Sequence, residues 1–200
     1  MSLITDKITQ FQAVQSTENK EHYASLASSQ APHTLLVTCS DSRLCPQEFT
    51  STEAGELFVI RNAGNLMPAY SAEAPTNEGL TLEFGVCALG VKEIVVCGHS
   101  SCGAMAGLQD TSKLDALPLV QKGLETYKAA HKCEVDACDS LESLIDWNVH
   151  KQVESVMGYP FVQEKVAKGE LKVSGIVYDF VKAEVLYSCE VQKNGEIAVL

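Results

Sequence analysis

Two short stretches contain the side chains best suited to chemistry. In VTCSDSRL an apolar run ends at Cys39, and Asp41 and Arg43 follow within four residues. In GHSSCGA, His99 and Cys102 are three positions apart. Thiolate and imidazole are donors that Zn²⁺ prefers; structural zinc sites use four protein ligands, whereas catalytic sites use three and leave one position for water. Cys39, His99 and Cys102 are therefore candidate ligands of one zinc ion, and their number favours an open site.

Two other chemistries could use the same residues. A closed structural zinc site would need a fourth ligand, for which Cys45 or Asp41 is available, but such a site has no use for Arg43. The eight cysteines suggest a thiol redox protein, yet the C-x-x-C spacing that lowers one thiol pKa beside its resolving partner is missing. Cys97, in an apolar run two positions before His99, is predicted to be a buried core thiol. The remaining cysteines have no metal-like spacing and are expected to be core or surface thiols: Cys87, Cys133, Cys138 and Cys189.

The fold has to bring the two stretches together. Four apolar runs rich in β-branched residues predict strands at 33–39, 57–62, 93–99 and 172–180, and their unbroken apolar character is typical of strands covered on both faces. Helical segments are expected between them, at 77–89, from Cys102, at 119–131 and at 140–157. This alternation predicts an α/β fold with a mostly parallel central sheet of about four strands flanked by helices, and AEVLYSCEV adds an antiparallel edge strand. Ligands bind beyond the carboxyl ends of the strands in such sheets, which is where Cys39 and His99 fall.

Composition and the first thirty residues complete the description. The 200 residues, 46% of them hydrophobic, fit a single domain over 1–200. Residues up to about 30 are mostly polar with apolar positions at helical spacing, which predicts an N-terminal helical arm of one or two amphipathic helices. A net charge of −11 without a Lys/Arg cluster argues against nucleic acid and membrane surfaces as partners. Since no signal-like or membrane-spanning run is found, a cytoplasmic location is expected.

Three motifs together resemble the β-class carbonic anhydrases: CSDSR from Cys39, VIRNAGN at 59–65, and HSSCG from His99. The resemblance implies that Cys39, His99 and Cys102 bind zinc, and that Asp41 and Arg43 form a pair in which Arg43 keeps the carboxylate off the metal. The implied reaction is the reversible hydration of carbon dioxide to bicarbonate and a proton by zinc-bound hydroxide. Activity is then expected to rise with pH. Hydrolysis of a related cumulene such as carbon disulfide is the alternative within the enzyme class.

The resemblance also implies a substrate pocket. Gln30 falls at a glutamine position of the family, Phe58, Ala63 and Phe84 fall at wall positions, and Gly103 would offer its backbone N–H to substrate. Phe84 stands where many relatives carry tyrosine, so no hydroxyl is available there. Because the family builds this pocket across two subunits, a homodimer or homotetramer is expected.

An inhibitory bicarbonate site of some bacterial relatives is expected to be missing. Those relatives carry a tryptophan three positions, and a glycine one position, before the first cysteine ligand, where this sequence has Leu36 and Thr38. Arg61 belongs to the same region in the family. At a strand end it is expected to have a structural role, paired with an acidic neighbour.

Overall fold

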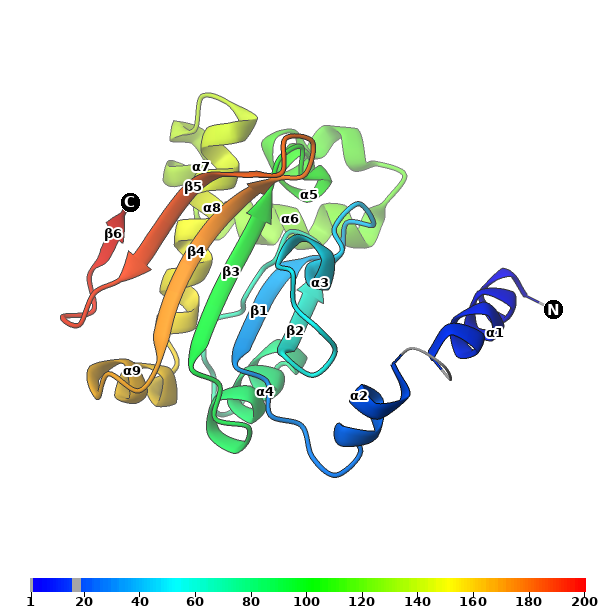
Figure 1. Ribbon diagram of the computed structural model, residues 1–200. Helices are drawn as coiled ribbons and strands as arrows, with labels where there is room; N and C mark the ends of the chain where they lie inside the picture. The colour runs from blue at the N-terminus through cyan, green and yellow to red at the C-terminus, as the bar shows by residue number, and fades with distance from the viewer. Residues whose placement is uncertain (1, 16–18) are drawn as a thin grey trace.

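The computed structural model describes residues 2–15 and 19–200. These residues form a six-stranded sheet in the order β2-β1-β3-β4-β5-β6, which lies at the centre of Figure 1. Strands β1 to β4 are parallel, whereas β5 and β6 are antiparallel to their neighbours. The predicted fold class is therefore confirmed, and β6 is an addition that is too short to show a period in the sequence. The strands are β1 (Thr34–Cys39), β2 (Leu57–Asn62), β3 (Glu93–His99), β4 (Lys172–Asp179), β5 (Glu184–Val191) and β6 (Ile197–Val199).

The longer helices match the predicted segments. The segment predicted at 77–89 is an α-helix that continues as a π-helical turn, Phe84–Ala88, and the segment predicted at 140–157 begins after Ser140, whose hydroxyl accepts from the Ser143 N–H. Three shorter helices were not predicted: α3 (Pro46–Phe49), α7 (Lys132–Ala137) and α9 (Pro160–Ala167). None of the described helices is both long and apolar enough to cross a lipid bilayer. The helices are α1 (Leu3–Gln15), α2 (Lys20–Ser25), α3 (Pro46–Phe49), α4 (Asn77–Glu83), α5 (Gly103–Gln109), α6 (Pro118–Ala130), α7 (Lys132–Ala137), α8 (Leu141–Met157) and α9 (Pro160–Ala167).

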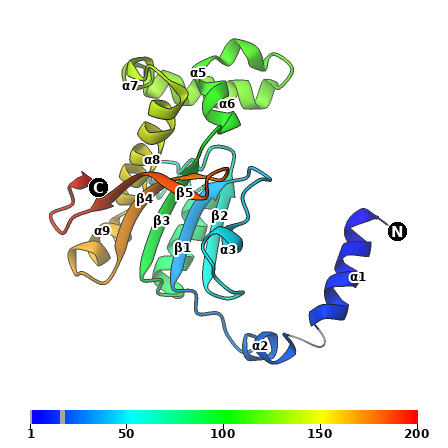
Figure 2. The same ribbon diagram turned by 45° about the horizontal axis from the view of Figure 1, so that its top comes forward.

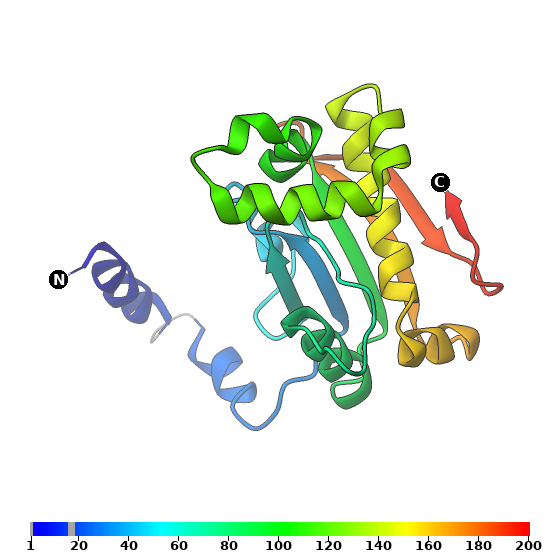
Figure 3. The same ribbon diagram turned by 180° about the vertical axis from the view of Figure 1, so that it is seen from behind.

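The two faces of the sheet are covered unequally. Helices α4, α6, α8 and α9 lie on the face seen in Figure 3, and α3 lies on the opposite face, seen in Figure 1. All six residues of β1 are buried, as expected for a strand covered on both faces. The same expectation is wrong for β2, where only Ile60 is buried, because β2 is an edge strand of the sheet. It is also wrong for β4, whose burial alternates.

Helix α8 lies directly on β3 and β4 because both strands carry a glycine beneath it. A Cβ at Gly98 would lie 2.6 Å from Val149 Cγ2, and a Cβ at Gly175 would lie 2.6 Å from Val149 Cγ1. Val149 itself is fully buried. The close approach therefore requires the absence of side chains at these two positions.

The N-terminal arm stands apart from the sheet in Figures 1, 2 and 3. It contains α1 and α2, in agreement with the prediction of one or two helices, although residues 1 and 16–18 of the predicted arm lie outside the described residues. The rings of Phe11 and Tyr23 meet edge to face, with centroids 6.4 Å apart. Several apolar side chains of α1 remain exposed, including Leu3, Ile4 and Ile8.

Strand β1 pairs with β2 on one side and with β3 on the other. The chain thus leaves β1 in one direction to form β2 and then crosses to the other side to form β3. In open α/β sheets this reversal leaves a crevice beyond the carboxyl ends of the two strands, where ligands bind.

Candidate metal centre

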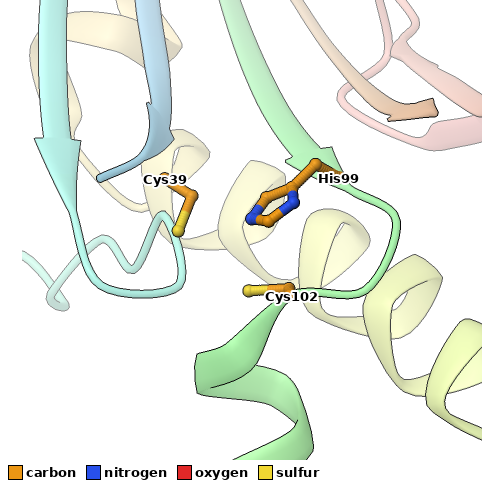
Figure 4. A group of neighbouring side chains, drawn as sticks. All are labelled: Cys39, His99 and Cys102. Atoms are coloured by element: carbon orange, nitrogen blue, oxygen red, sulfur yellow. The ribbon is translucent and has the colours of Figure 1, made fainter. Parts of the chain in front are cut away.

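The three predicted ligands meet in this crevice, as Figure 4 shows. Cys39 ends β1, His99 ends β3, and Cys102 lies just before α5. Their ligand atoms, two sulfurs and a ring nitrogen, all lie within 4.8 Å of one another, and all three residues are buried. Ser101 supports the turn between His99 and Cys102 with a positive φ of 55°, a conformation that persists in a non-glycine residue only where the surrounding structure requires it.

The imidazole of His99 is oriented for binding through Nε2. Its Nδ1 lies 3.0 Å from the carbonyl oxygen of Ser100. A carbonyl only accepts, so Nδ1 carries the proton and Nε2 has a free lone pair. Nε2 is buried and has no hydrogen-bond partner within the described residues. A buried, unpartnered nitrogen facing two sulfurs fits a soft metal ion, because an unsatisfied buried acceptor is otherwise unfavourable.

The Cys39 and Cys102 side chains are within hydrogen-bonding reach of each other. The hydrogen bond from the Cys102 thiol lowers the pKa of Cys39 most, the Gly64 N–H lowers it further, and the result is a pKa of about 4 despite burial. The Gly64 nitrogen lies 3.4 Å from Cys39 Sγ. The same shared hydrogen bond and burial raise the pKa of Cys102. A bound cation would favour the thiolate form of both cysteines.

Asp41 and Arg43 form a two-point ion pair beside the ligands. Arg43 Nε donates to Asp41 Oδ1 at 2.9 Å, and Nη2 donates to Oδ2 at 2.7 Å. These side-chain hydrogen bonds hold the pKa of Asp41 well below its usual range. Nη2 also donates to the carbonyl oxygen of Ser101 at 3.1 Å. Asp41 Oδ2 lies 3.9 Å from His99 Nε2, so the held carboxylate borders the space that the ligand atoms surround.

Arg61 has a structural role, but with different partners from those expected. Its Nε donates to the Cys39 carbonyl oxygen at 3.0 Å, and its Nη2 donates to the carbonyl oxygens of Asp41 and Leu44 at 2.9 and 3.3 Å. Within the described part of the chain, the guanidinium therefore binds backbone oxygens rather than an acidic side chain. These three bonds fix the turn that contains the first ligand and Asp41.

The predicted pocket residues fall into two groups. Ala63 follows the end of β2 and Gly103 follows Cys102, so both belong to the ligand end of the sheet. Phe58 lies near the other end of β2, in register with Leu35, and four residues of strand span roughly 13 Å. Phe84 contacts Phe58, with ring centroids 6.0 Å apart.

Gln30 is exposed and precedes β1, again at the end of the sheet opposite the ligands. One subunit therefore does not gather Gln30, Phe58 and Phe84 around its own metal centre. Their role as pocket residues stays a prediction that requires a second copy of the chain.

A buried polar network behind the site was not signalled by the motifs. Asn148 Nδ2 donates to the carbonyl oxygen of Gly64 at 3.1 Å, and Gln152 Oε1 accepts from the Met67 N–H at 2.7 Å. Gln152 also donates to Asn148 Oδ1 at 3.0 Å. The network fixes the loop whose Gly64 N–H points at Cys39 Sγ. A usable signal was present in the sequence, because Asn148 and Gln152 lie four residues apart on the apolar face of α8.

The remaining cysteines stay outside the metal centre. Cys97 is fully buried, and burial raises its pKa to about 12, which confirms the expected core thiol. Cys45 is exposed and is not among the clustered ligands of the described residues. The other four are also free thiols: Cys189 is buried, Cys138 is partly buried, and Cys87 and Cys133 are exposed.

Carbonic anhydrase sequences are similar to this chain. A sequence model of the carbonic anhydrase family matches residues 34–185. The carbonic anhydrase of Synechococcus elongatus is 36% identical over 193 residues, covering 93% of this chain and 71% of the relative. The carbonic anhydrase of Pseudomonas aeruginosa is 38% identical over 187 residues, covering 91% of this chain and 84% of the relative.

Comparison with solved structures gives the same result. The β-carbonic anhydrase CcaA superimposes with a TM-score of 0.84 at 31% identity, covering 98% of this chain and 92% of that chain. A tetrameric β-carbonic anhydrase from Sordaria macrospora superimposes with a TM-score of 0.78 at 26% identity, covering 98% of this chain and 96% of that chain.

Proposed function

The chain belongs to the β-carbonic anhydrases, and from this membership we propose that it catalyses the reversible hydration of carbon dioxide to bicarbonate and a proton. The observation that carries the proposal is the clustering of Cys39, His99 and Cys102 beside the Asp41–Arg43 ion pair. Family membership supplies the reaction class, and this cluster supplies residues suited to it.

We propose that the cluster binds one zinc ion per subunit. Bound there, Zn²⁺ would act as a Lewis acid that lowers the pKa of water and so provides a nucleophile near neutral pH, a behaviour for which carbonic anhydrase is itself the usual example. The protein sets the charge of the site through Cys39 and Cys102, whose two thiolates would neutralise the cation. The hydrogen bond from His99 Nδ1 to the Ser100 carbonyl keeps Nε2 available and fixes the ring.

In this proposal Asp41 orients the reacting water, and Arg43 holds Asp41. Oδ2 faces the ligand atoms and can accept a hydrogen bond from a water there, which leaves the water lone pair directed toward the carbon of the substrate. A carboxylate this close could instead become a ligand. The two-point grip of Arg43 opposes that movement, because leaving it would break two charge-assisted hydrogen bonds.

We further propose that the apolar pocket is completed by a second copy of the chain in a homodimer or homotetramer. The positions of Gln30, Phe58 and Phe84 support this, since they lie at the opposite end of the sheet from the ligands. The exposed apolar residues of the arm also favour burial against another subunit. Ala63 and the Gly103 N–H would then complete the wall from the ligand side. Light scattering on the purified protein would give the subunit number.

The alternatives receive less support. In a closed zinc site Asp41 would have to leave Arg43, and Cys45 is exposed outside the cluster. A redox role lacks the C-x-x-C spacing that pairs a reactive thiol with its resolving partner. We propose a cytoplasmic location because the proposed zinc ligands Cys39 and Cys102 must remain reduced. No observation favours carbon disulfide over carbon dioxide.

Stopped-flow hydration of carbon dioxide with a pH indicator tests the proposal. Purified protein of measured zinc content is assayed from about pH 6.5 to about pH 9, together with Cys39→Ala and the matched control Cys45→Ala. We expect turnover that increases with pH, loss of zinc and activity in Cys39→Ala, and retention of both in Cys45→Ala. Zinc-loaded protein without turnover, or loss of zinc in Cys45→Ala, would instead favour a structural site.

A further inference from the structure

The turn between β4 and β5 places an aromatic ring against the ion pair. The Phe180 ring centroid lies 4.4 Å from the guanidinium carbon of Arg43. The same ring lies near His99, with ring centroids 6.3 Å apart. Phe180 is outside the three sequence motifs, and its position beside the metal centre arises only from the fold.

The backbone around Phe180 is tied to the metal centre. Asp179, which is 8% exposed, ends β4 and turns its carboxylate back into the turn. Its Oδ1 accepts from the backbone N–H groups of residues 181 and 182 at 2.8 and 3.2 Å, and from the Ser100 hydroxyl at 3.3 Å. Because Ser100 directly follows His99, these bonds hold the turn in a fixed position relative to the metal centre.

The edge and one face of the Arg43 guanidinium are held by different groups. Along the edge, Nε and Nη2 bind Asp41 at 2.9 and 2.7 Å, and Nη2 also binds the Ser101 carbonyl. Phe180 covers a face. The Arg43 side chain is nevertheless 47% exposed, so water competes for its donors. An aromatic ring on a guanidinium face both attracts the cation and excludes water from that side.

We propose that Phe180 is a positioning residue for the reaction, acting through Arg43. By restraining the guanidinium plane, the ring keeps both Arg43 hydrogen bonds on Asp41 and so keeps Asp41 directed at the reacting water. The inference rests on the proposed function only in its effect on turnover. The restraint of Arg43 itself is a physical property that can be measured without any substrate.

A matched control lies in the same cavity. Arg43, Phe180, Phe49 and Tyr178 line a cavity of about 360 Å³. Phe49 stacks on Tyr178, with ring centroids 4.7 Å apart and an interplanar angle of 20°, and its contact is thus with a ring rather than with the guanidinium. Phe49→Leu therefore removes an aromatic ring from this wall and leaves the Phe180–Arg43 contact in place.

The test compares Phe180→Leu, which preserves apolar bulk without a π face, with Phe180→Tyr, which retains the face. The first measurement is solvent exchange of the Arg43 Nε–H by NMR, with the resonance identified by its loss in Arg43→Lys. The second is kcat/KM for carbon dioxide hydration. We expect about fivefold faster exchange and about fivefold lower kcat/KM in Phe180→Leu, from the typical strength of an exposed cation–π contact. Phe180→Tyr and Phe49→Leu should stay within about twofold of the parent protein.

Three results would overturn the inference: equal behaviour of the Leu and Tyr variants at position 180, equal effects of Phe180→Leu and Phe49→Leu, or a change in only one of the two measurements. Thermal unfolding of each variant shows whether a substitution causes a general loss of structure. If substitution at position 180 acted only through such a loss, Phe180→Tyr would not keep the Arg43 Nε–H exchange rate and kcat/KM near the values of the parent protein. If the parent protein does not hydrate carbon dioxide at all, the proposed function fails. The exchange measurement would then decide separately whether Phe180 restrains Arg43.

Discussion

Adding a single methyl group beneath α8, in Gly98→Ala, should disturb the metal centre without touching a ligand. The new Cβ would lie 2.6 Å from Val149 Cγ2, about 0.8 Å inside ordinary van der Waals contact. Val149 is buried in a helix, and its β-branched side chain has essentially one rotamer there, so it cannot turn away. Relief requires α8 and β3 to separate.

Overpacking of this kind typically costs about 1–3 kcal/mol. In a chain of this size each kcal/mol lowers Tm by about 2–4 °C, so we expect a decrease of about 2–12 °C. Gly98 directly precedes His99, and Val149 is adjacent to Asn148, which holds the Gly64 loop. The displacement therefore reaches Cys39 and His99 from two sides, and zinc affinity should fall by roughly tenfold, as when partners behind a ligand are lost.

Differential scanning calorimetry and chelator competition for zinc measure the two effects. Gly103→Ala is the control, because a Cβ at that position meets nothing within 4 Å, and it should not lower Tm. Adding Val149→Ala to Gly98→Ala removes the clashing methyl groups. The double variant should then lose less stability than the two single variants lose in sum, by at least about 1 kcal/mol. An unchanged Tm in Gly98→Ala, or strict additivity with Val149→Ala, would refute the reasoning.

Three further outcomes are expected. Arg61→Ala removes three hydrogen bonds to the ligand turn and should lower stability by about 1–3 kcal/mol and weaken zinc binding; chemical denaturation and zinc titration check this, and unchanged zinc binding would contradict the assigned role. Burial, reinforced by Glu142, raises the pKa of Asp146, so its carboxylate opposes folding once the pH is above its unfolded pKa of about 3.9. Asp146→Asn should therefore raise Tm at pH 7 by about 1–2 °C after allowance for solvent screening, with the gain vanishing near pH 3; a gain independent of pH would show another cause. Removing zinc with a chelator should lower Tm and abolish turnover, both restored by added Zn²⁺; full activity in metal-free protein would exclude the proposed metal centre.

The sequence predicts most of the fold because the signals involved are local. Four β-branched runs separated by helical segments are sufficient for a mostly parallel sheet, and all four appear as β1 to β4. The shortest of the elements that the sequence did not predict are α3, with four residues, and β6, with three. Segments of that length do not complete a measurable hydrophobic period. The partial burial of β2 was not predicted, because composition does not say which strand becomes an edge, and the alternating burial of the interior strand β4 was not predicted either.

The metal centre likewise combines features that the sequence predicted and features that only the tertiary structure decided. Residue type and spacing were sufficient to propose the ligands Cys39, His99 and Cys102. In a parallel sheet, side chains at the carboxyl ends of neighbouring strands lie at the same edge of the sheet, where ligands bind. Whether Arg61 binds carboxylates or carbonyl oxygens depended on the turn that folds over it. The Phe180 ring reaches Arg43 from a hairpin far away in the chain, and Asn148 reaches Gly64 from α8. Such contacts are set by how whole elements pack, and no local pattern encodes the distance between elements, so only the tertiary structure could decide them.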